Sequence, residues 1–471
     1  MESRSKYLIK NVGILTISNF ASKILVFLLV PLYTSILSTK DVGLYDLIVS
    51  TVSVLVPLLT LNIVDAVMRF LMDENKSKEE IAVIGIRYVL FSSAAAALLV
   101  IVLSRFKFFS SINGFEIPII LYFVSYVFNN FMIQFTKGLE KIGDMGIAGV
   151  LGTVTTIGAN ILLLIIFKFG LLGFFAATIL GQAVPAIYLF IRIKLWDYIK
   201  TIDVNRSLQR EMIIYCAPLI TTTVGWWVNN ASDKYIVSII CGVGANGILA
   251  VSYKIPQIIN TLHGIFTQAW QISAIKEYEK EDSAQFYGKS FILLNVLLAG
   301  TCSVLIILSK PLAYVLYQND FYIAWQYVPF LLISCAVNSA SGFYGSILSA
   351  KKDSKSMAVS AIYGAAANII MNILLVLLIG IQGAAIATAI SSLIIYYFRK
   401  RAVKNDIVVE KYIIVPITWG LLCAQSLIEI YTSLWWIEII IIIVMAAINR
   451  NNIMKLISFI ASLIKRKGKK V

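Results

Sequence analysis

The sequence lacks the residues from which metal, haem and nucleotide sites are usually built. Its 471 residues include one histidine, His263, and five cysteines that form no Cys-x-x-Cys pair. We therefore expect no zinc, haem or iron–sulfur site and no disulfide, the cysteines being small core side chains. The sequence contains no Gly-x-x-x-x-Gly-Lys-Ser/Thr phosphate loop, which argues against an ATPase. It thus predicts no metal site, no cofactor, no catalytic residue and no enzymatic activity.

Charged residues are scarce as well, and long apolar stretches take their place. Only 14% of the residues are charged and 59% are hydrophobic, whereas soluble domains have about 25% and about 45–50%. Apolar stretches of about 18 residues or more recur along almost the whole chain. Each can cross a hydrocarbon core about 30 Å thick as a helix. The composition predicts an all-α polytopic membrane protein.

Apolar windows between polar breaks predict about 14 transmembrane helices. The predicted spans are 12–36, 43–71, 82–104, 118–136, 146–167, 171–191, 212–240, 246–275, 289–309, 326–349, 357–379, 382–398, 412–430 and 434–448. Glu429 and Glu438 flank the turn between the last two spans, and we expect them to reach interfacial water. The amphipathic, basic tail at 450–471 either lies on anionic lipid or only sets the topology.

The distribution of basic residues over this map predicts the orientation. Of the 40 Lys and Arg residues, 30 fall in the termini and alternate loops on one side, and 5 on the other. By the positive-inside rule, both termini are cytoplasmic and the chain is a multi-pass protein of the cytoplasmic membrane. The net charge of +15 then reflects topology and contact with the bilayer, and we expect no nucleic-acid partner.

The sequence also repeats itself at an offset of about 210 residues. The stretch at 170–178 matches that at 380–388 as G-x-x-G-x-x-x-A-T, and Asn160-Ile-Leu-Leu163 matches Asn372-Ile-Leu-Leu375. The offset pairs spans 1–6 with spans 7–12, and because six is even the halves share one orientation. We expect two six-helix bundles related by a pseudo-two-fold axis along the membrane normal. The expected domains are the bundles at 1–200 and 201–400, an extra helix pair at 401–449 and a cytoplasmic tail at 450–471.

Ionisable residues inside the spans gather in the first two spans of each half. They are Lys23, Asp65, Arg69, Asp233, Lys234 and Lys254. Each costs at least about 2.5–3.5 kcal/mol at mid-bilayer, so it needs a cavity or a partner. Polar residues share helical faces with the lysines: Asn19 with Lys23, Asn230 with Lys234, and Gln257 and Gln268 with Lys254. We expect these faces to line a cleft between the halves.

Some of these residues have a second interpretation. Arg69 is near the cytoplasmic end of its span, so it either snorkels, with Asp65 as its salt-bridge partner, or faces the cavity. Asp233 either neutralises Lys254 or another cation, or acts on its own. His263 lies opposite the polar stripe of its helix, and we expect it to be buried and hydrogen-bonded.

Several short segments carry a resemblance to a known family. They are NVGILTISN at 11–19, PLYT at 31–34, DVGLY at 41–45, DKYIV at 233–237 and AVSYK at 250–254. With them, essentially the whole chain resembles the oligosaccharide flippases of Wzx type, a family of the multidrug/oligosaccharidyl-lipid/polysaccharide (MOP) exporter superfamily. The resemblance implies two six-helix bundles around a V-shaped central cleft that works by alternating access.

The resemblance also implies a substrate: an undecaprenyl-diphosphate-linked oligosaccharide repeat unit, carried from the inner to the outer leaflet for cell-surface polysaccharide synthesis. Basic cleft residues of the family bind the diphosphate, a role open here to Lys23, Lys234, Lys254 and Arg69. The Asn and Gln residues on the same faces offer hydrogen bonds to sugar hydroxyls. Asp65 and Asp233 are candidates for salt bridges or for binding a coupling ion, H⁺ or Na⁺. A polysaccharide polymerase is a candidate partner beside the lipid bilayer.

Three other functions stay open. A lipid II flippase for peptidoglycan synthesis would carry an equally anionic substrate, although that family leans on arginines. A multidrug antiporter for organic cations needs acids in its cleft, whereas the intramembrane cations here outnumber the acids. A membrane enzyme such as a polymerase or ligase typically needs a large outer loop, and the outer connections here are short.

Overall fold

The computed structural model describes residues 27–106, 113–200, 205–278, 280–410, 412–432 and 434–454, without the side chains of a few residues in helices α10 and α12. Within these ranges the chain is helical, with no β-strand. In the part of the chain that the structure describes, ten helices are long and apolar enough to cross a membrane. The chain is therefore an all-helical, multi-pass membrane protein, as the composition predicts.

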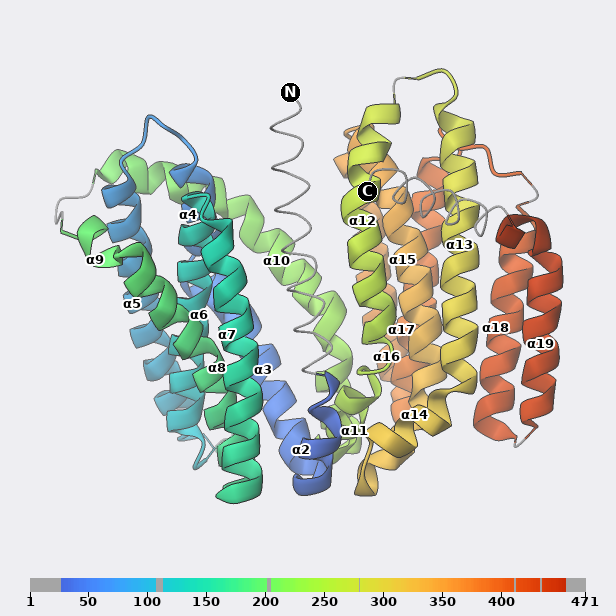
Figure 1. Cartoon of the computed structure of the whole chain (residues 1–471), viewed down its shortest axis with the longest axis horizontal. Helices are drawn as coiled ribbons and strands as arrows, with labels where there is room; N and C mark the ends of the chain where they lie inside the picture. The colour runs from blue at the N-terminus through green and yellow to red at the C-terminus, as the bar shows by residue number, and fades with distance from the viewer. Residues whose placement is uncertain are drawn as a thin grey trace, which may run out of the picture. The chain divides into compact units, whose positions relative to one another are not determined.

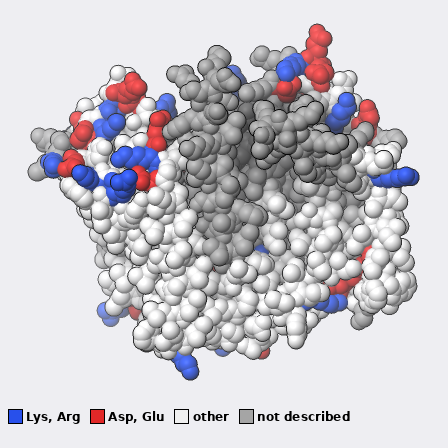
Figure 2. Space-filling model, viewed as in Figure 1, with Lys and Arg blue, Asp and Glu red and all other residues white. Residues whose placement is uncertain are grey.

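The contacts divide the chain into two compact units, Met1–Ala231 and Ser232–Val471. The division falls inside α10 (Arg206–Cys241), so the polypeptide passes from one unit into the next within a helix. In the face shown in Figure 2, charged side chains gather at the helix ends, and the flanks between them are almost free of charge. This distribution is the one expected of helices that face lipid.

The first unit is built around α6 (Glu116–Gly138), which packs against five other helices (Figure 1). The elements before and after it are α2 (Val30–Ile36), α3 (Thr39–Leu59), α4 (Ile63–Leu71), α5 (Lys78–Leu103), α7 (Ile142–Asn160), the π-helix η2 (Ile161–Ile166), α8 (Gly170–Ile193) and α9 (Leu195–Tyr198). Its main neighbours are α4, α5 and α8, and it also contacts α3 and α7. The fully buried rings of Phe131 and Phe135 fill the core between them.

The expectation of one continuous helix over 43–71 is wrong, because the segment breaks into α3 and α4. Leu61 and Asn62 adopt positive φ angles of 50° and 56°, which end the first helix. The Asn62 N–H donates to the Pro57 carbonyl at 2.9 Å, and the Cys216 thiol donates to the Asn62 carbonyl at 3.3 Å. The break is tolerated at membrane depth because other protein groups satisfy its backbone.

The second unit is built around α15 (Val328–Ala350), of whose 23 residues 18 are buried. The unit also contains the end of α10, α11 (Val243–Ser252), α12 (Gln257–Glu277), α13 (Ser283–Ile307), α14 (Ser309–Leu316), the 3₁₀ segment η3 (Asn319–Tyr327), α16 (Ser354–Ile379), α17 (Ile381–Ala402), α18 (Ile414–Tyr431) and α19 (Trp435–Ile448). The elements packed against α15 are α12, α13, α16, α17, α18 and η3. Trp270 of α12 stacks on Phe343 of α15, with ring centroids 4.1 Å apart. Aromatic stacking thus joins α12 to the central helix.

The span expected at 246–275 is likewise not one helix but two, α11 and α12. Residues 253–256 form turns between them, and Pro256 begins the second helix. Proline has no N–H with which to continue the helical bonding of α11, so the sequence provides the cause of the break. The break moves Tyr253 and Lys254 out of regular helix, which matters for the site.

The repeated sequence motif forms the same kind of turn in each unit. Gly170 and Gly380, which begin the two copies, adopt positive φ angles of 54° and 63°, a region that favours glycine. Three residues on, Gly173 lies against the Leu163 carbonyl, and Gly383 lies against the carbonyl of Leu375. The repeat therefore encodes a tight turn with close helix contact.

We predict that Gly383→Ala lowers the melting temperature more than Gly173→Ala does. A Cβ at 383 would overlap the backbone of Leu375, which cannot rotate away, whereas a Cβ at 173 would lie 3.1 Å from the Leu163 carbonyl oxygen. Overpacking of this kind costs about 1–3 kcal/mol. Thermal unfolding of the purified protein in detergent measures the difference.

Gly420→Ala is the matched control for this experiment, because a Cβ at 420 meets nothing within 4 Å. Replacing a mid-helix glycine there should leave the protein as stable or stabilise it by up to about 1 kcal/mol. A Gly383→Ala protein as stable as Gly420→Ala would contradict the packing described for the repeated turn.

Candidate functional site

The structure describes only some of the residues predicted to bind substrate. Lys23 and Asn19 lie outside the described residues, and so do the side chains of Asn230 and Gln268. Asp65 and Arg69 belong to the first unit, and the remaining candidates belong to the second.

In the first unit, Asp65 and Arg69 stand at opposite ends of the short helix α4. The half-buried Asp65 carboxylate accepts a hydrogen bond from Gln134 of α6, with Oδ1 and Nε2 2.8 Å apart. Arg69 is exposed, and among the described residues it has no ion pair with Asp65. The acid at the first turn and the base at the last both suit the helix dipole. The partner of the Asp65 carboxylate in the structure is thus Gln134 of α6.

In the second unit, Asp233 of α10 is the buried centre of the polar residues, with 3% of its surface exposed. The Tyr253 hydroxyl, from the break between α11 and α12, donates to its Oδ2. The Lys234 backbone N–H donates to its Oδ1 at 2.9 Å. A buried carboxylate is costly unless hydrogen-bonded, so these donors explain how α10 tolerates it.

Lys234 and Lys254 each follow a member of this hydrogen-bonded pair by one residue, and both are half-buried. The bond between Asp233 and Tyr253 thus ties together the two segments that carry the lysines. Gln257, the first residue of α12, is exposed three positions after Lys254. The two linked segments together carry two lysines and one carboxylate, a net positive charge that suits an anionic ligand.

A network of polar residues from α16 and α17 adjoins Asp233. The Ser232 hydroxyl donates to Asn368 Oδ1 at 2.8 Å, and Asn368 Nδ2 is 3.4 Å from Ser391 Oγ. Asn372 donates to the Asn368 carbonyl at 2.9 Å, and its own buried Oδ1 accepts no hydrogen bond from any described residue. Sequence reasoning missed this network, although the i, i+4 spacing of Asn368 and Asn372 in an apolar span was a visible signal.

The structure tests two further expectations, one for His263 and one for Glu429 and Glu438. His263 is partly buried, with its Nε2 3.0 Å from the Thr267 hydroxyl, as expected for a hydrogen-bonded histidine. Glu429 and Glu438 do not reach interfacial water: 4% and 1% of their surfaces are exposed. The prediction for the two glutamates is wrong because α18 and α19 pack that end of the hairpin against α13 and α14.

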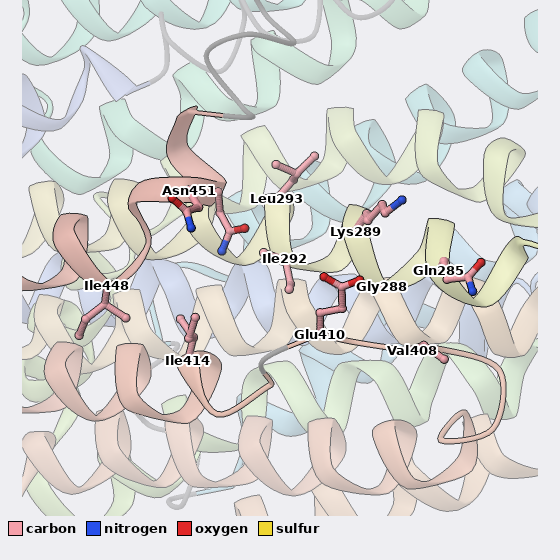
Figure 3. A pocket seen from close by; sticks show the side chains of 11 residues that line it. Gln285, Gly288, Lys289, Ile292, Leu293, Val408, Glu410, Ile414, Ile448 and Asn451 are labelled. Carbon is pink, nitrogen blue, oxygen red and sulfur yellow. The ribbon is translucent and has the colours of Figure 1, made fainter.

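A groove of about 430 Å³ lies elsewhere in the second unit and contains none of the predicted site residues. It is lined by α13, by the 403–410 segment that follows α17, and by the start of α18 and the end of α19. Figure 3 shows Lys289 of α13 and Glu410 of the connecting segment around the same opening. A positive and a negative side chain thus line it together, which gives it no excess of charge for a diphosphate.

Comparison with known proteins places the chain in a family. Residues 8–271, more than half of the chain, match the family model described as polysaccharide biosynthesis protein. No curated protein sequence matches significantly.

Solved structures of transporters are similar to the chain at low sequence identity. One is the lipid II flippase MurJ in an inward closed conformation (15% identity, 93% of this chain and 99% of that one, TM-score 0.63). Another is an inward-facing multidrug resistance MATE transporter of the MOP superfamily (13% identity, 82% and 95%, TM-score 0.64). A MOP superfamily transporter from Pyrococcus furiosus Vc1 is similar over 84% of this chain and 93% of that one (13% identity, TM-score 0.53). The chain therefore belongs to the polysaccharide biosynthesis protein family and has the fold of MOP superfamily transporters.

Proposed function

We propose that the protein is a flippase that moves an undecaprenyl-diphosphate-linked oligosaccharide repeat unit from the inner to the outer leaflet of the cytoplasmic membrane by alternating access. In this proposal two six-helix bundles, related by a pseudo-two-fold axis, alternate around a central cleft, and both termini are cytoplasmic. About 14 helices cross the membrane, the last two being an extra pair. The family match and the transporter fold support a role in transport and none in catalysis.

The observation that carries the proposal is the hydrogen bond between Asp233 and Tyr253, which links the segments that carry Lys234 and Lys254. Both are half-buried, and each directly follows a member of the Asp233–Tyr253 hydrogen bond in the sequence. A sugar diphosphate is anionic and strongly hydrated, so it cannot enter hydrocarbon unless fixed charges replace its water. Two ammonium groups on neighbouring segments are suited to that exchange, and the exposed Gln257 amide offers hydrogen bonds to sugar hydroxyls.

The remaining candidates extend this site in the proposal. Lys23 and Asn19 supply the equivalent cation and amide from the first unit, with the exposed Arg69 guanidinium nearer the membrane surface. Asn230 and Gln268 continue the polar faces of Lys234 and Lys254. A cation from each unit would let the diphosphate keep a partner as the protein changes from inward-facing to outward-facing.

Two other substrates are candidates: lipid II, which is also an anion, and organic cations, which the similarity in fold to multidrug transporters suggests. Lipid II is also a diphosphate, and the similarity to a lipid II flippase over nearly the whole chain keeps it as the second candidate. An organic cation would meet Lys234 and Lys254 with like charge, so the multidrug function is disfavoured. In this proposal a polysaccharide polymerase receives the flipped repeat unit.

Asp233 is also the proposed coupling residue. Its carboxylate, Asn368 Oδ1 and the buried Asn372 Oδ1 place oxygen ligands on neighbouring parts of α10 and α16. Oxygen donors of this kind suit Na⁺, and a buried carboxylate alone suits H⁺. When the ion leaves, the Asp233 carboxylate is a buried negative charge without its counter-ion. It then attracts the Lys234 and Lys254 ammonium groups, which weakens their binding of the substrate.

We predict that Lys234→Ala and Lys254→Ala each slow flipping about tenfold or more, and that the double variant loses less than the product of the two. Charge-assisted hydrogen bonds contribute about 1.5–3 kcal/mol, and two groups acting on one diphosphate are not additive. Flipping of the lipid-linked oligosaccharide in proteoliposomes measures the effect, with the exposed Lys404→Ala as control. If the loss of flipping in the double variant equals the product of the two single losses, the two lysines act on different groups of the substrate.

We predict that Lys23→Ala abolishes flipping while membrane insertion and abundance stay near normal. Lys23 is the candidate cation nearest the middle of its predicted span, where an unused charge would be costly. Transport in proteoliposomes, set against protein yield and elution volume on size exclusion, separates lost function from misfolding. A fully active Lys23→Ala protein would remove this residue from the proposed site.

We predict that Asp233→Asn removes the dependence of flipping on a Na⁺ or H⁺ gradient while substrate binding is retained. The amide keeps the shape and the hydrogen bond from Tyr253 but carries no charge. Flipping rates measured with and without each imposed gradient test this, with Asp65→Asn as the matched variant of the first unit. If Asp65→Asn alone abolishes the gradient dependence, coupling belongs to Asp65 and the assignment to Asp233 fails.

A further inference from the structure

A seam of buried polar side chains holds the α18–α19 hairpin against α13 (Figure 1). Trp419 donates to Asn295 Oδ1 at 2.7 Å, and the Ser303 hydroxyl donates to Gln425 Oε1 at 2.6 Å. Gln425 Nε2 in turn donates to the Ser303 carbonyl at 3.0 Å. Because lipid offers such groups no partner, their pairing contributes to docking of the hairpin.

Two carboxyl groups end this seam where α18 meets α19. Ser309 Oγ donates to Glu429 Oε1 at 3.0 Å, and Gln425 Nε2 lies 3.4 Å from Glu438 Oε2. Lys310 Nζ lies 3.5 Å from the Glu429 carboxylate and donates to its backbone carbonyl at 2.8 Å. Both glutamates are almost fully buried.

The charges around the pair do not balance unless a proton is present. Lys310 of α14 is the one cation that forms an ion pair with either glutamate among the described residues, and it also lies over the Trp325 ring of η3. The other titratable groups along this part of the seam are thiols: Cys302 of α13, Cys335 of α15 and Cys423 of α18. Two carboxylates against one ammonium leave an uncompensated buried charge.

The hydrogen bonding of Glu438 points the same way. Gln425 is the one described side chain in hydrogen-bond contact with the buried Glu438 carboxyl, and its Nε2 lies 3.4 Å from Oε2. A buried carboxylate with so few donors is costly, whereas a protonated carboxyl carries no charge and can both donate and accept.

We propose that Glu429 and Glu438 form a proton-binding site, in which one shared proton keeps the α18–α19 hairpin docked against α13 and its release undocks the hairpin. The docked form holds the proton and the undocked form, with its glutamates in contact with polar surroundings, gives it up. Raising the pH therefore favours undocking, and lowering it favours docking. This inference depends on neither the substrate nor the coupling ion proposed above.

The test uses the full-length protein in lipid nanodiscs. Infrared spectra at about pH 7 should contain a protonated-carboxyl band that Glu438→Gln removes. The melting temperature of the wild type should fall as the pH rises from about 6 to about 9, and that fall should vanish in Glu438→Gln. The side-chain amide that this substitution introduces donates to Glu429 without a titrating proton. Asp320→Asn, an exposed acid in η3, is the control and should keep the wild-type profile.

Two results of these measurements would contradict the proposed proton site. A wild-type spectrum without a band that depends on Glu438, or a pH profile shared by wild type and Glu438→Gln, overturns the proposal. If Glu438→Gln yields no folded protein, wild type carrying carboxyl-labelled glutamate replaces it. A labelled protonated-carboxyl band that disappears in step with the fall in melting temperature supports the shared proton, and a band that persists through the fall overturns it.

Discussion

The burial of the Asp233 carboxylate is the constraint on which the local structure of the second unit depends. An ionised group inside apolar helices must find donors in the protein, since lipid offers none. Tyr253 can reach Asp233 because Pro256 ends the helical bonding of α11, and the Lys234 N–H completes the pairing. The broken span, the hydrogen bond and the adjacent lysines are thus parts of one arrangement.

The same requirement explains other features that polar residues impose on this apolar chain. Asp65 finds Gln134 in the first unit, and the non-helical residues between α3 and α4 are bonded by Pro57 and Cys216. Each element departs from a simple apolar helix only where another element supplies the missing partner. Polar side chains in this protein are therefore evidence of specific neighbours, whether they serve transport or docking.

Much of the fold could be predicted from composition and hydropathy, because apolar length and the cost of unpaired backbone leave few alternatives to membrane helices. Even the repeated turns at Gly170 and Gly380 were visible as a motif. The breaks after Leu59 and Ser252 were not predicted, although Pro57 and Pro256 lie beside them, because proline is ordinary in membrane helices and does not by itself identify a break. Sequence identified Asp233 as costly, but its partner Tyr253 looked like an ordinary membrane tyrosine. The burial of Glu438 depends on how α19 packs, which hydropathy does not encode.

The family and the fold agree with a carrier for a large anionic lipid, and the described lysines give that role a chemical basis. The most direct test is flipping by the purified protein in proteoliposomes, with undecaprenyl-diphosphate oligosaccharide, lipid II and an organic cation offered side by side. We expect the oligosaccharide lipid to be flipped fastest and the cation not to be transported. Transport of the cation without any flipping of either lipid would contradict the account.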